Sequence, residues 1–229
     1  MLGFMGEFDL IETFFKRPPR HATLGVGDDC ALLAVSAGQQ LAISSDMLVE
    51  GRHFLSTVAP VRLGHKSLAV NLSDLAACGA TPRVFLLSLA LPRADEEWLA
   101  GFSTGLFQLA DAHGCELIGG DTTQGPLNIA ITVMGEVPCA QAVLRSGARA
   151  GDDLYVSGHL GDARLALEAF RGHISLPQSV FDAARLRMEM PEPRLALGQS
   201  LRGVATAMAD ISDGLLGDLR SEEHTSELQ

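Results

Sequence analysis

The segment 115–137 reads CELIGGDTTQGPLNIAITVMGEV, and it predicts two β-strands separated by a polar turn. Its first part is an apolar strand that ends in two glycines, directly before Asp121. In its second part Ile129, Ile131 and Val133 alternate with other residues, as a strand with one buried face requires. The first strand therefore carries a carboxylate, that of Asp121, at its polar end.

Strands and helices alternate upstream of this segment. Strands are predicted at 41–46 and 83–91, and helical periodicity at 61–77 and 98–109. Such alternation indicates an α/β or α+β fold rather than a helical bundle. A domain boundary is expected near 138–145, which gives a first domain at 1–139 and a second at 140–219. In the second domain the predicted elements are a turn that leads into a strand within 146–158, helices at 163–170, 181–188 and 194–201, and a strand within 204–219 that leads into the start of a helix near Gly214.

Composition narrows the class of protein. The chain has 229 residues, 47% of them hydrophobic, and a formal net charge of −11. This charge disfavours binding to nucleic acid or to an anionic membrane surface. The four cysteines lack metal-ligand spacing, and the N-terminus lacks the basic region of a secretory signal. We therefore expect a cytoplasmic protein, and we expect the polar segment RSEEHTSELQ at 220–229 to be a non-native tail.

Acidic residues recur in five short segments, each next to apolar sequence. Any one of them could be a turn, a helix cap or a strand end. Taken together, however, they form a set of oxygen ligands almost without histidine or cysteine, which suits Mg²⁺ and phosphate chemistry. The segments are GVGDDCA with Asp28 and Asp29, AISSDML with Ser44, Ser45 and Asp46, NLSDLAA with Asn71, Ser73 and Asp74, LIGGDTT with Asp121, and MADISDG with Asp210, Ser212 and Asp213.

Other phosphate-handling and hydrolytic motifs are absent or misplaced. Neither lysine of the chain, Lys16 or Lys66, completes a P-loop. The stretch GFSTG at 101–105 matches the G-x-S-x-G pattern of hydrolases around Ser103. It falls inside a predicted helix, whereas a nucleophile elbow needs a turn between strand and helix. A metal-dependent phosphohydrolase would usually have histidines among its ligands.

The order and spacing of five motifs resemble the bacterial thiamine-monophosphate kinase family across residues 4–219. This family is related to aminoimidazole ribonucleotide synthetase, selenophosphate synthetase and a hydrogenase maturation factor. The motifs that carry the resemblance are GDDCALL, ISSDMLVEGRHF, KSLAVNLSDLAACGATP, LIGGDTTQGPL and DISDGLL.

The resemblance implies a fold, a reaction and a site. The fold is an N-terminal ATP- and Mg²⁺-binding domain with a mixed, mainly antiparallel sheet that pairs in a homodimer, followed by an incomplete second α/β domain. ATP would phosphorylate thiamine monophosphate directly, without a catalytic base from the protein. The implied metal ligands are Asp29, Ser44, Ser45, Asp46, Asp74, Asp121, Asp210 and Asp213, with Asp28 less certain; the ATP contacts are Gly120, Asp121, Arg145 and Ser212, and the substrate contact is His53.

The sequence also departs from the family pattern. The family's second domain continues past the SDG motif and includes a GGED element, which this chain lacks. Two alternatives therefore stay open: a truncated, non-catalytic Mg²⁺-nucleotide-binding fragment, and another ATP-dependent member of the same superfamily. Gly119 and Gly120 are expected to let the backbone approach the nucleotide, beside a cation held by Asp121.

Overall fold

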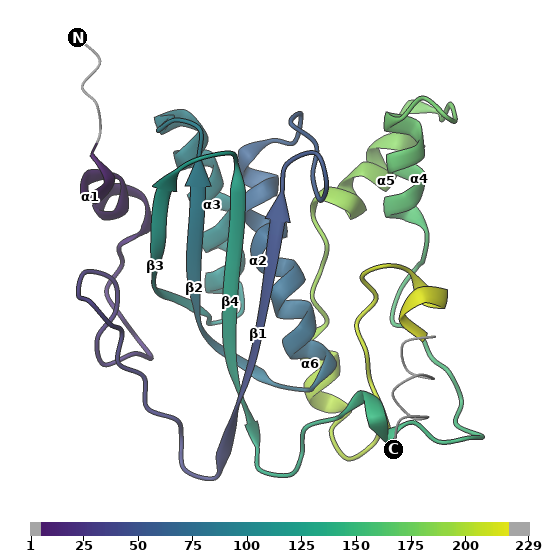
Figure 1. Ribbon diagram of the computed structural model, residues 1–229. Coiled ribbons are helices and arrows are strands. Elements are labelled where there is room, and N and C mark those ends of the chain that lie inside the picture. The colour runs from purple at the N-terminus through teal and green to yellow at the C-terminus, as the bar shows by residue number, and fades with distance from the viewer. Residues whose placement is uncertain (1–5, 220–229) are drawn as a thin grey trace.

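A computed structural model describes residues 6–219 of the chain, and a four-stranded sheet forms its centre (Figure 1). The strands are β1 (Gln39–Val49), β2 (Thr81–Leu91), β3 (Glu116–Gln124) and β4 (Asn128–Pro138), in the spatial order β1-β4-β2-β3. β4 runs antiparallel to both β1 and β2, whereas β2 and β3 are parallel. The mixed, mainly antiparallel sheet with flanking helices confirms the expected fold class.

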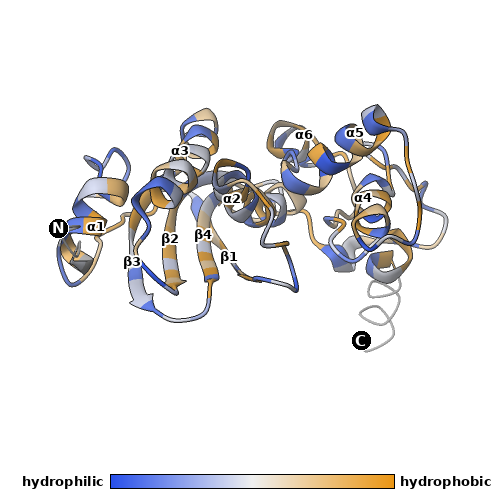
Figure 2. Cartoon of the chain, turned by 90° about the horizontal axis from the view of Figure 1, so that it is seen from above, coloured by the Kyte–Doolittle hydropathy of each residue, from blue (hydrophilic) through white to orange (hydrophobic). Residues whose placement is uncertain are grey.

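Two long helices cover one face of this sheet (Figure 2). They are α2 (Pro60–Ala77) and α3 (Glu96–Ala112), and α3 makes the crossover between the parallel strands β2 and β3. Leu72 of α2, Phe102 of α3 and Phe85 of β2 are fully buried in the shared core. The predicted helices and strands of the first domain therefore exist, and burial of apolar side chains between the two layers holds them together.

The opposite face of the sheet has no helix packed on it within residues 6–219 (Figure 2). We call it the open face. On β1 its side chains include Ile43 and Met47, which are 60% and 55% exposed. Side chains alternate between the two faces along a strand, so Ser45 lies on the open face, and Ser44 and Asp46 lie on the helix side.

The N-terminal segment covers one end of the open face. After α1 (Glu7–Leu10) and a π-helical turn (Ile11–Phe15), residues 20–36 cross from the β3 edge to β4. Ala22 packs on Val84 of β2 and Ile118 of β3, and Ala31 and Leu33 join the same small cluster. This segment carries Asp28 and Asp29.

The chain beyond β4 is mostly helix and irregular backbone. It contains a 3₁₀ turn (Arg145–Gly147), α4 (Asp162–Phe170), α5 (Gln178–Glu189) and α6 (Leu195–Ser200). α5 and α6 dock on α2: Arg62 Nη1 lies 2.7 Å from Glu189 Oε2, and Leu195 is buried in the main core. The three helices predicted here are therefore present.

The two strands predicted in this part are not formed. Residues 146–158 and 204–219 carry no strand in the structure. A strand is stable only when its backbone pairs with a neighbour, and no neighbouring strand stands beside either segment within residues 6–219. These strands were predicted from apolar sequence alone, and that prediction was wrong. The expected tail at 220–229 lies outside the described residues.

No helix among the described residues is long and apolar enough to cross a lipid bilayer.

Candidate functional site

The centre of the candidate site is formed by the edge strand β1 and the helix α2. Ser44 of β1 donates a hydrogen bond from Oγ to Oδ2 of Asp74 on α2, at 2.5 Å. The backbone N–H of Asp46 donates to Oδ1 of Asn71, one turn earlier on the same helix, at 3.1 Å. Asn71 is 1% exposed and also donates to the Ser67 carbonyl. Both polar contacts fix the position of β1 against α2.

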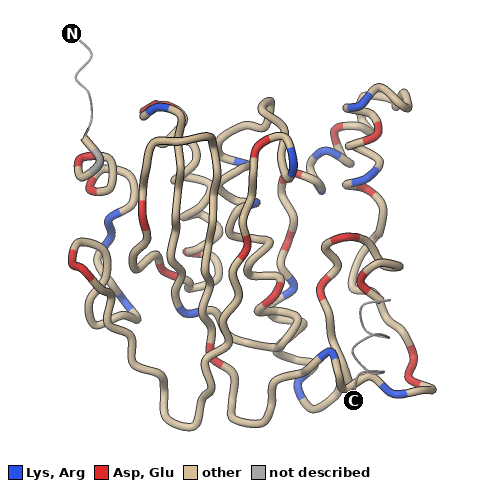
Figure 3. The backbone as a smooth tube through the Cα atoms, viewed as in Figure 1, with Lys and Arg blue, Asp and Glu red and all other residues tan. Residues whose placement is uncertain are grey.

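Three carboxylates from distant segments influence one another here. Burial raises the pKa of Asp46, and so does the charge of Asp210, while nearby His53 lowers it. Burial raises the pKa of Asp74, which the Ser44 hydrogen bond lowers and the Asp46 charge raises. In Figure 3, β1, α2 and the C-terminal segment each carry acidic positions, coloured red. The fold therefore gathers like charges, which disfavours their ionised forms.

Asp210 completes this group from the far end of the chain. Burial raises the pKa of Asp210 first, and the charge of Asp74 raises it further, while a hydrogen bond from the Ser73 side chain lowers it. We call Asp46, Asp74 and Asp210 the β1 cluster. The Ser212 hydroxyl is 3.4 Å from Oδ2 of Asp210, so Ser212 lies beside the cluster.

The residues that follow Asp210 form a tight turn. The backbone N–H groups of Ser212, Asp213 and Gly214 all donate to Oδ2 of Asp218, at 2.9, 3.2 and 3.1 Å. Asp213 is exposed at this turn. The structure therefore places Ser212 and Asp213 close to Asp210 in the chain and holds them in a hydrogen-bonded loop.

His53 lies in the turn that follows β1. Its Nδ1 accepts a hydrogen bond from the Val49 N–H at 3.0 Å, and its carbonyl accepts one from Lys66 Nζ at 2.9 Å. Burial lowers the pKa of Lys66, and the charge of Glu189 partly offsets that effect. A half-buried cation on α2 therefore holds the turn that carries the expected substrate contact, His53.

Asp121 and Gly120 lie at the opposite edge of the sheet. In the register, Asp46 pairs with Ile131, Ile131 with Leu87, and Leu87 with Gly120. Three strand spacings of about 4.8 Å place β1 and β3 roughly 14 Å apart. Asp121 is exposed, pairs with Ser88 in the register, and belongs to the open face. It is too far from the β1 cluster to share a metal ion with it in one chain.

Gly120 also has a structural reason to be glycine. Its φ is +143°, and a Cβ there would lie 1.8 Å from the Leu87 carbonyl oxygen of β2. No side chain fits that space without separating β2 from β3. The strand pairing by itself therefore requires glycine at this position.

Asp28 and Asp29 lie at the exposed tip of a small hairpin. Thr23 N–H donates to the Leu32 carbonyl at 2.7 Å, and Leu32 N–H donates to the Leu24 carbonyl at 3.0 Å. At the tip, Asp29 N–H donates to Oδ1 of Asp28 at 2.7 Å. We call residues 23–32 the GDD hairpin. Ala31 at its end, with Leu33 beyond it, packs with Val84 and Ile118 on the open face, whereas Val26 packs against the main core, so the hairpin lies near the β3 edge of the sheet.

The two remaining expected site residues lie outside these groups. Ser45 faces the open side, where its hydroxyl is 2.9 Å from the Thr132 hydroxyl of β4. Arg145 is exposed in the 3₁₀ turn after β4. That turn lies against the irregular segment before Asp210. A Cβ at Gly147 would lie only 2.0 Å from the Thr206 carbonyl oxygen. Arg145 is thus placed beside the segment that leads to the β1 cluster.

The β1 cluster suits a hard divalent cation shared with phosphate. Its donors are all carboxylate oxygens, and a cation would offset the repulsion that raises their pKa values. Within residues 6–219, no three histidine, cysteine or acidic side chains stand close enough to form a closed metal centre. Mg²⁺ does not need one, because it keeps several waters and takes ligands from substrate phosphates. The residues present therefore fit Mg²⁺ bound together with a nucleotide.

The structure also shows roles that the sequence did not reveal. Asn71 belongs to one of the polar segments of the sequence, but the sequence did not show that its side chain accepts from the backbone N–H of Asp46. Ser103 lies in the middle of α3 and donates to the Ala100 carbonyl at 3.2 Å, so it is not at a strand-to-helix turn. The hydrolase pattern around Ser103 is therefore part of a packed helix.

Comparisons with known proteins agree with this architecture. Residues 27–137 match the model of the AIR synthase related protein, N-terminal domain. The thiamine-monophosphate kinase of Salmonella typhimurium is 47% identical over 220 residues, which cover 93% of this chain and 67% of that protein. The Bacillus subtilis thiamine-monophosphate kinase is 36% identical over 94% of this chain and 69% of its own length. The chain thus spans about two thirds of the length of these curated relatives.

Solved structures give the same result. The thiamine-monophosphate kinase from Stenotrophomonas maltophilia has a TM-score of 0.84 at 45% identity, over 90% of this chain and 67% of that one. AaThiL complexed with AMPPCP and TMP has a TM-score of 0.78 at 32% identity, over 85% and 63% of the two chains. Identity, coverage and fold together show that this chain belongs to the thiamine-monophosphate kinase family.

Proposed function

We propose that this chain uses Mg²⁺·ATP to phosphorylate thiamine monophosphate and so forms thiamine diphosphate. The observation that carries the proposal is the convergence of Asp46, Asp74 and Asp210 in a relative of thiamine-monophosphate kinases. AMPPCP is an analogue of ATP, so the complex of AaThiL with AMPPCP and TMP supports both substrates.

The chain's residues would act by binding and orienting. The acceptor is a phosphate, which is already an anion at neutral pH, so no residue needs to remove a proton from it. Mg²⁺ would neutralise the phosphates and stabilise the charge that moves in the transition state. The β1 cluster would hold it, Ser44 and Asn71 would fix that cluster, and His53 would meet the substrate beside it.

We further propose a homodimer whose open faces meet. Exposed Ile43 and Met47 on an uncovered sheet face support it. A twofold axis parallel to the strands would place β1 of one copy over β3 of the other. The partner's Asp121 and GDD hairpin would then lie beside the edge strand β1. Because the β1 cluster lies on the helix side of β1, the composite site would form around this free edge. Free cysteines and water-soluble substrates support a cytoplasmic location.

A turnover assay tests the kinase activity. The purified chain is incubated with ATP, Mg²⁺ and thiamine monophosphate, and thiamine diphosphate is detected by mass. We expect product from the parent chain and none from Asp46→Ala or Asp121→Ala, with the fold of each variant checked by circular dichroism. Near-normal kcat in either folded variant would contradict its assignment.

The second candidate is a nucleotide-binding fragment without turnover. It is favoured by the separation of Asp121 from the β1 cluster across the sheet of one chain. Thermal stabilisation by Mg²⁺·ATP without formation of thiamine diphosphate would support this candidate against the kinase.

A further inference from the structure

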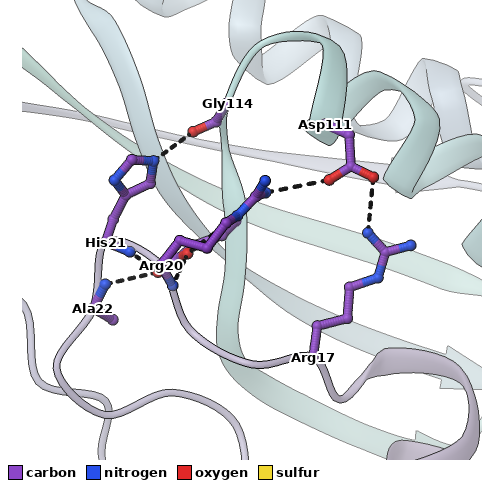
Figure 4. A network of polar contacts seen from close by, with 7 residues as sticks. Arg17, Arg20, His21, Ala22, Asp111 and Gly114 are labelled. Carbon is purple, nitrogen blue, oxygen red and sulfur yellow. Dashed lines mark hydrogen bonds and ion pairs between the residues drawn. The ribbon is translucent and has the colours of Figure 1, made fainter.

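The GDD hairpin is attached to the sheet by a buried carboxylate on its N-terminal side. Glu116, the first residue of β3, is 6% exposed. Its Oε2 accepts a hydrogen bond from the Arg20 N–H at 2.6 Å, and its Oε1 accepts from His21 and Ala22 N–H at 2.9 and 2.7 Å. Figure 4 shows these bonds converging where the segment meets β3. One side chain therefore holds three successive backbone amides just before the hairpin.

A second buried carboxylate holds the C-terminal side. Glu136, near the end of β4, is 8% exposed. Its Oε1 accepts from Ser36 N–H at 2.8 Å, and its Oε2 accepts from Ser36 Oγ at 2.9 Å. Arg83 Nε of β2 lies 3.6 Å from the same Oε2. Glu116 and Glu136 thus accept hydrogen bonds from the chain on both sides of the hairpin, at the same end of the same sheet face.

Both carboxylates are stabilised in their charged form by these donors. Burial alone would raise the pKa of Glu116, but the N–H groups of Ala22, Arg20 and His21 outweigh it, and the pKa lies below its ordinary value. The pKa of Glu136 is lowered in the same way, because the Ser36 donors and Arg83 outweigh burial. Hydrogen bonds to a charged acceptor are stronger than neutral ones, so both attachments are firm.

The hairpin has little else to hold its tip. Asp28 and Asp29 are exposed, and the apolar contacts of the segment come from small or partly buried side chains: Ala22, Ala31 and Leu33 on the open face, and Val26 against the main core. A carboxylate that binds a metal with its phosphate must be held within a fraction of an ångström. The geometry of the tip therefore depends on where its two ends are fixed.

We propose that Glu116 and Glu136 are positioning residues that fix the GDD hairpin so that Asp29 and Asp28 can bind Mg²⁺·nucleotide. This inference rests on the proposed function, because it takes the hairpin as part of the nucleotide site. Neither glutamate touches substrate, and each acts through the backbone that it holds. Residues that orient a metal ligand in this way typically change metal affinity by about 10- to 100-fold when they are replaced.

Amide hydrogen exchange tests the attachment directly. Glu116→Gln keeps the side-chain volume but turns one acceptor into a donor that faces an N–H. We expect the amides of residues 20–22 to exchange faster in this variant while the strands of the sheet stay protected. The matched control is Asp111→Asn, which removes the exposed ion pairs of Arg17 and Arg20 seen in Figure 4 but leaves Glu116 in place. Equal exchange in Glu116→Gln and the parent chain would overturn the attachment.

Binding of Mn²⁺·ATP, followed by electron paramagnetic resonance, tests the positioning. We expect Glu116→Gln and Glu136→Gln each to weaken binding about tenfold or more, and Asp111→Asn to leave it unchanged. In an Asp29→Ala background, Glu116→Gln should cause little further loss, because both changes act on the same ligand.

The outcomes separate the two ideas. A parent chain that binds no Mn²⁺·ATP would contradict the proposed function, and the positioning role would fall with it. Normal binding by the parent chain that Glu116→Gln leaves unchanged would overturn the positioning role alone. The positioning role would also be overturned if Glu116→Gln weakened Mn²⁺·ATP binding by the same factor in the Asp29→Ala background as in the parent chain.

Discussion

Asp74 carries a charge that its surroundings disfavour. Burial and the charge of Asp46 raise its pKa, and only the hydrogen bond from Ser44 works in the other direction. A raised folded-state pKa means that the ionised form is less stable in the fold than in the unfolded chain. The resulting loss of stability is complete at pH values above the folded pKa and vanishes below the ordinary carboxyl pKa. At neutral pH the residue therefore costs stability, which is consistent with a binding role.

Replacing this charge should separate stability from binding. We expect Asp74→Asn to raise the Tm at neutral pH without Mg²⁺, because the amide oxygen still accepts from Ser44 and the repulsion is gone. Asp74 is partly exposed, so solvent screening limits the gain to roughly 1 kcal/mol or less, about 2–4 °C. The same variant should lose the stabilisation that Mg²⁺·ATP gives the parent chain. Differential scanning fluorimetry with and without Mg²⁺·ATP measures both effects, and a lower Tm without metal would contradict the repulsion.

The sequence could show which residues are acidic, but it could not show what holds them. Asp46, Asp74 and Asp210 stand out because each interrupts apolar sequence or follows it. Asn71 stands in the same polar segment as Asp74, and Glu116 has no signal at all, but the role of both depends on backbone groups that are 25 and 94 to 96 residues away. Local patterns do not contain the distance between segments, so only the fold could reveal these contacts.

The helices α2 and α3 pack closely against each other at two glycines. A Cβ at Gly105 would lie 1.8 Å from the Val61 carbonyl oxygen, and one at Gly64 would lie 2.0 Å from the Phe102 carbonyl oxygen. Each helix thus presents a glycine to the backbone of the other. This packing explains Gly105, the second glycine of the hydrolase-like stretch at 101–105.

A pair of glycine substitutions in α3 measures this contact. Gly105→Ala should destabilise the chain by at least about 2 kcal/mol, since helix backbones must separate to admit the methyl group. Gly101→Ala is the matched control, because its Cβ would lie 3.1 Å from Pro60 Cβ and 3.6 Å from the Val61 nitrogen, well outside the 1.8 Å approach at Gly105. Alanine favours both helical positions by about 1 kcal/mol, so the difference between the variants isolates the clash. Similar urea midpoints for the two variants would contradict the close approach.

The elements themselves were predictable where pattern and packing agree. The helical periodicity of α2 and α3 and the apolar runs of β2 and β4 correspond to real elements. The reason is that the helix layer and the sheet bury each other's apolar side chains. The segments predicted as strands within 146–158 and 204–219 have similar apolar character but no strand beside them. A strand forms only by pairing with a neighbouring strand, and the sequence of one segment does not show whether such a neighbour exists.

At the scale of the whole molecule, the sheet divides the expected ligands. The β1 cluster lies on the helix side at one edge, Asp121 lies on the open face towards the other edge, and the GDD hairpin lies near that second edge. A pocket shared by all of them is therefore not formed within one chain. A composite site between two copies would reconcile the predicted ligand set with this separation.

Mixing two inactive variants tests this arrangement. In a mixed dimer of Asp46→Ala and Asp121→Ala chains, one composite site would lack both carboxylates and the other would be intact. Random pairing of equal amounts should therefore restore about a quarter of the parent activity, or of Mn²⁺·ATP binding capacity if turnover is absent. Each variant alone stays inactive as the control. No recovery after verified subunit exchange would place the whole site within single chains.

The position of β4 has a consequence for the order in which the chain can be built. β4 lies between β1 and β2 in space, yet it follows both in the chain. Until residues 128–138 leave the ribosome, the emerging polypeptide has a gap one strand wide, with unpaired amide and carbonyl groups on either side. Those two unpaired strand edges can pair with strands of other chains. Synthesis of the last strand therefore closes the sheet, and a pause before it would leave the nascent chain dependent on chaperones.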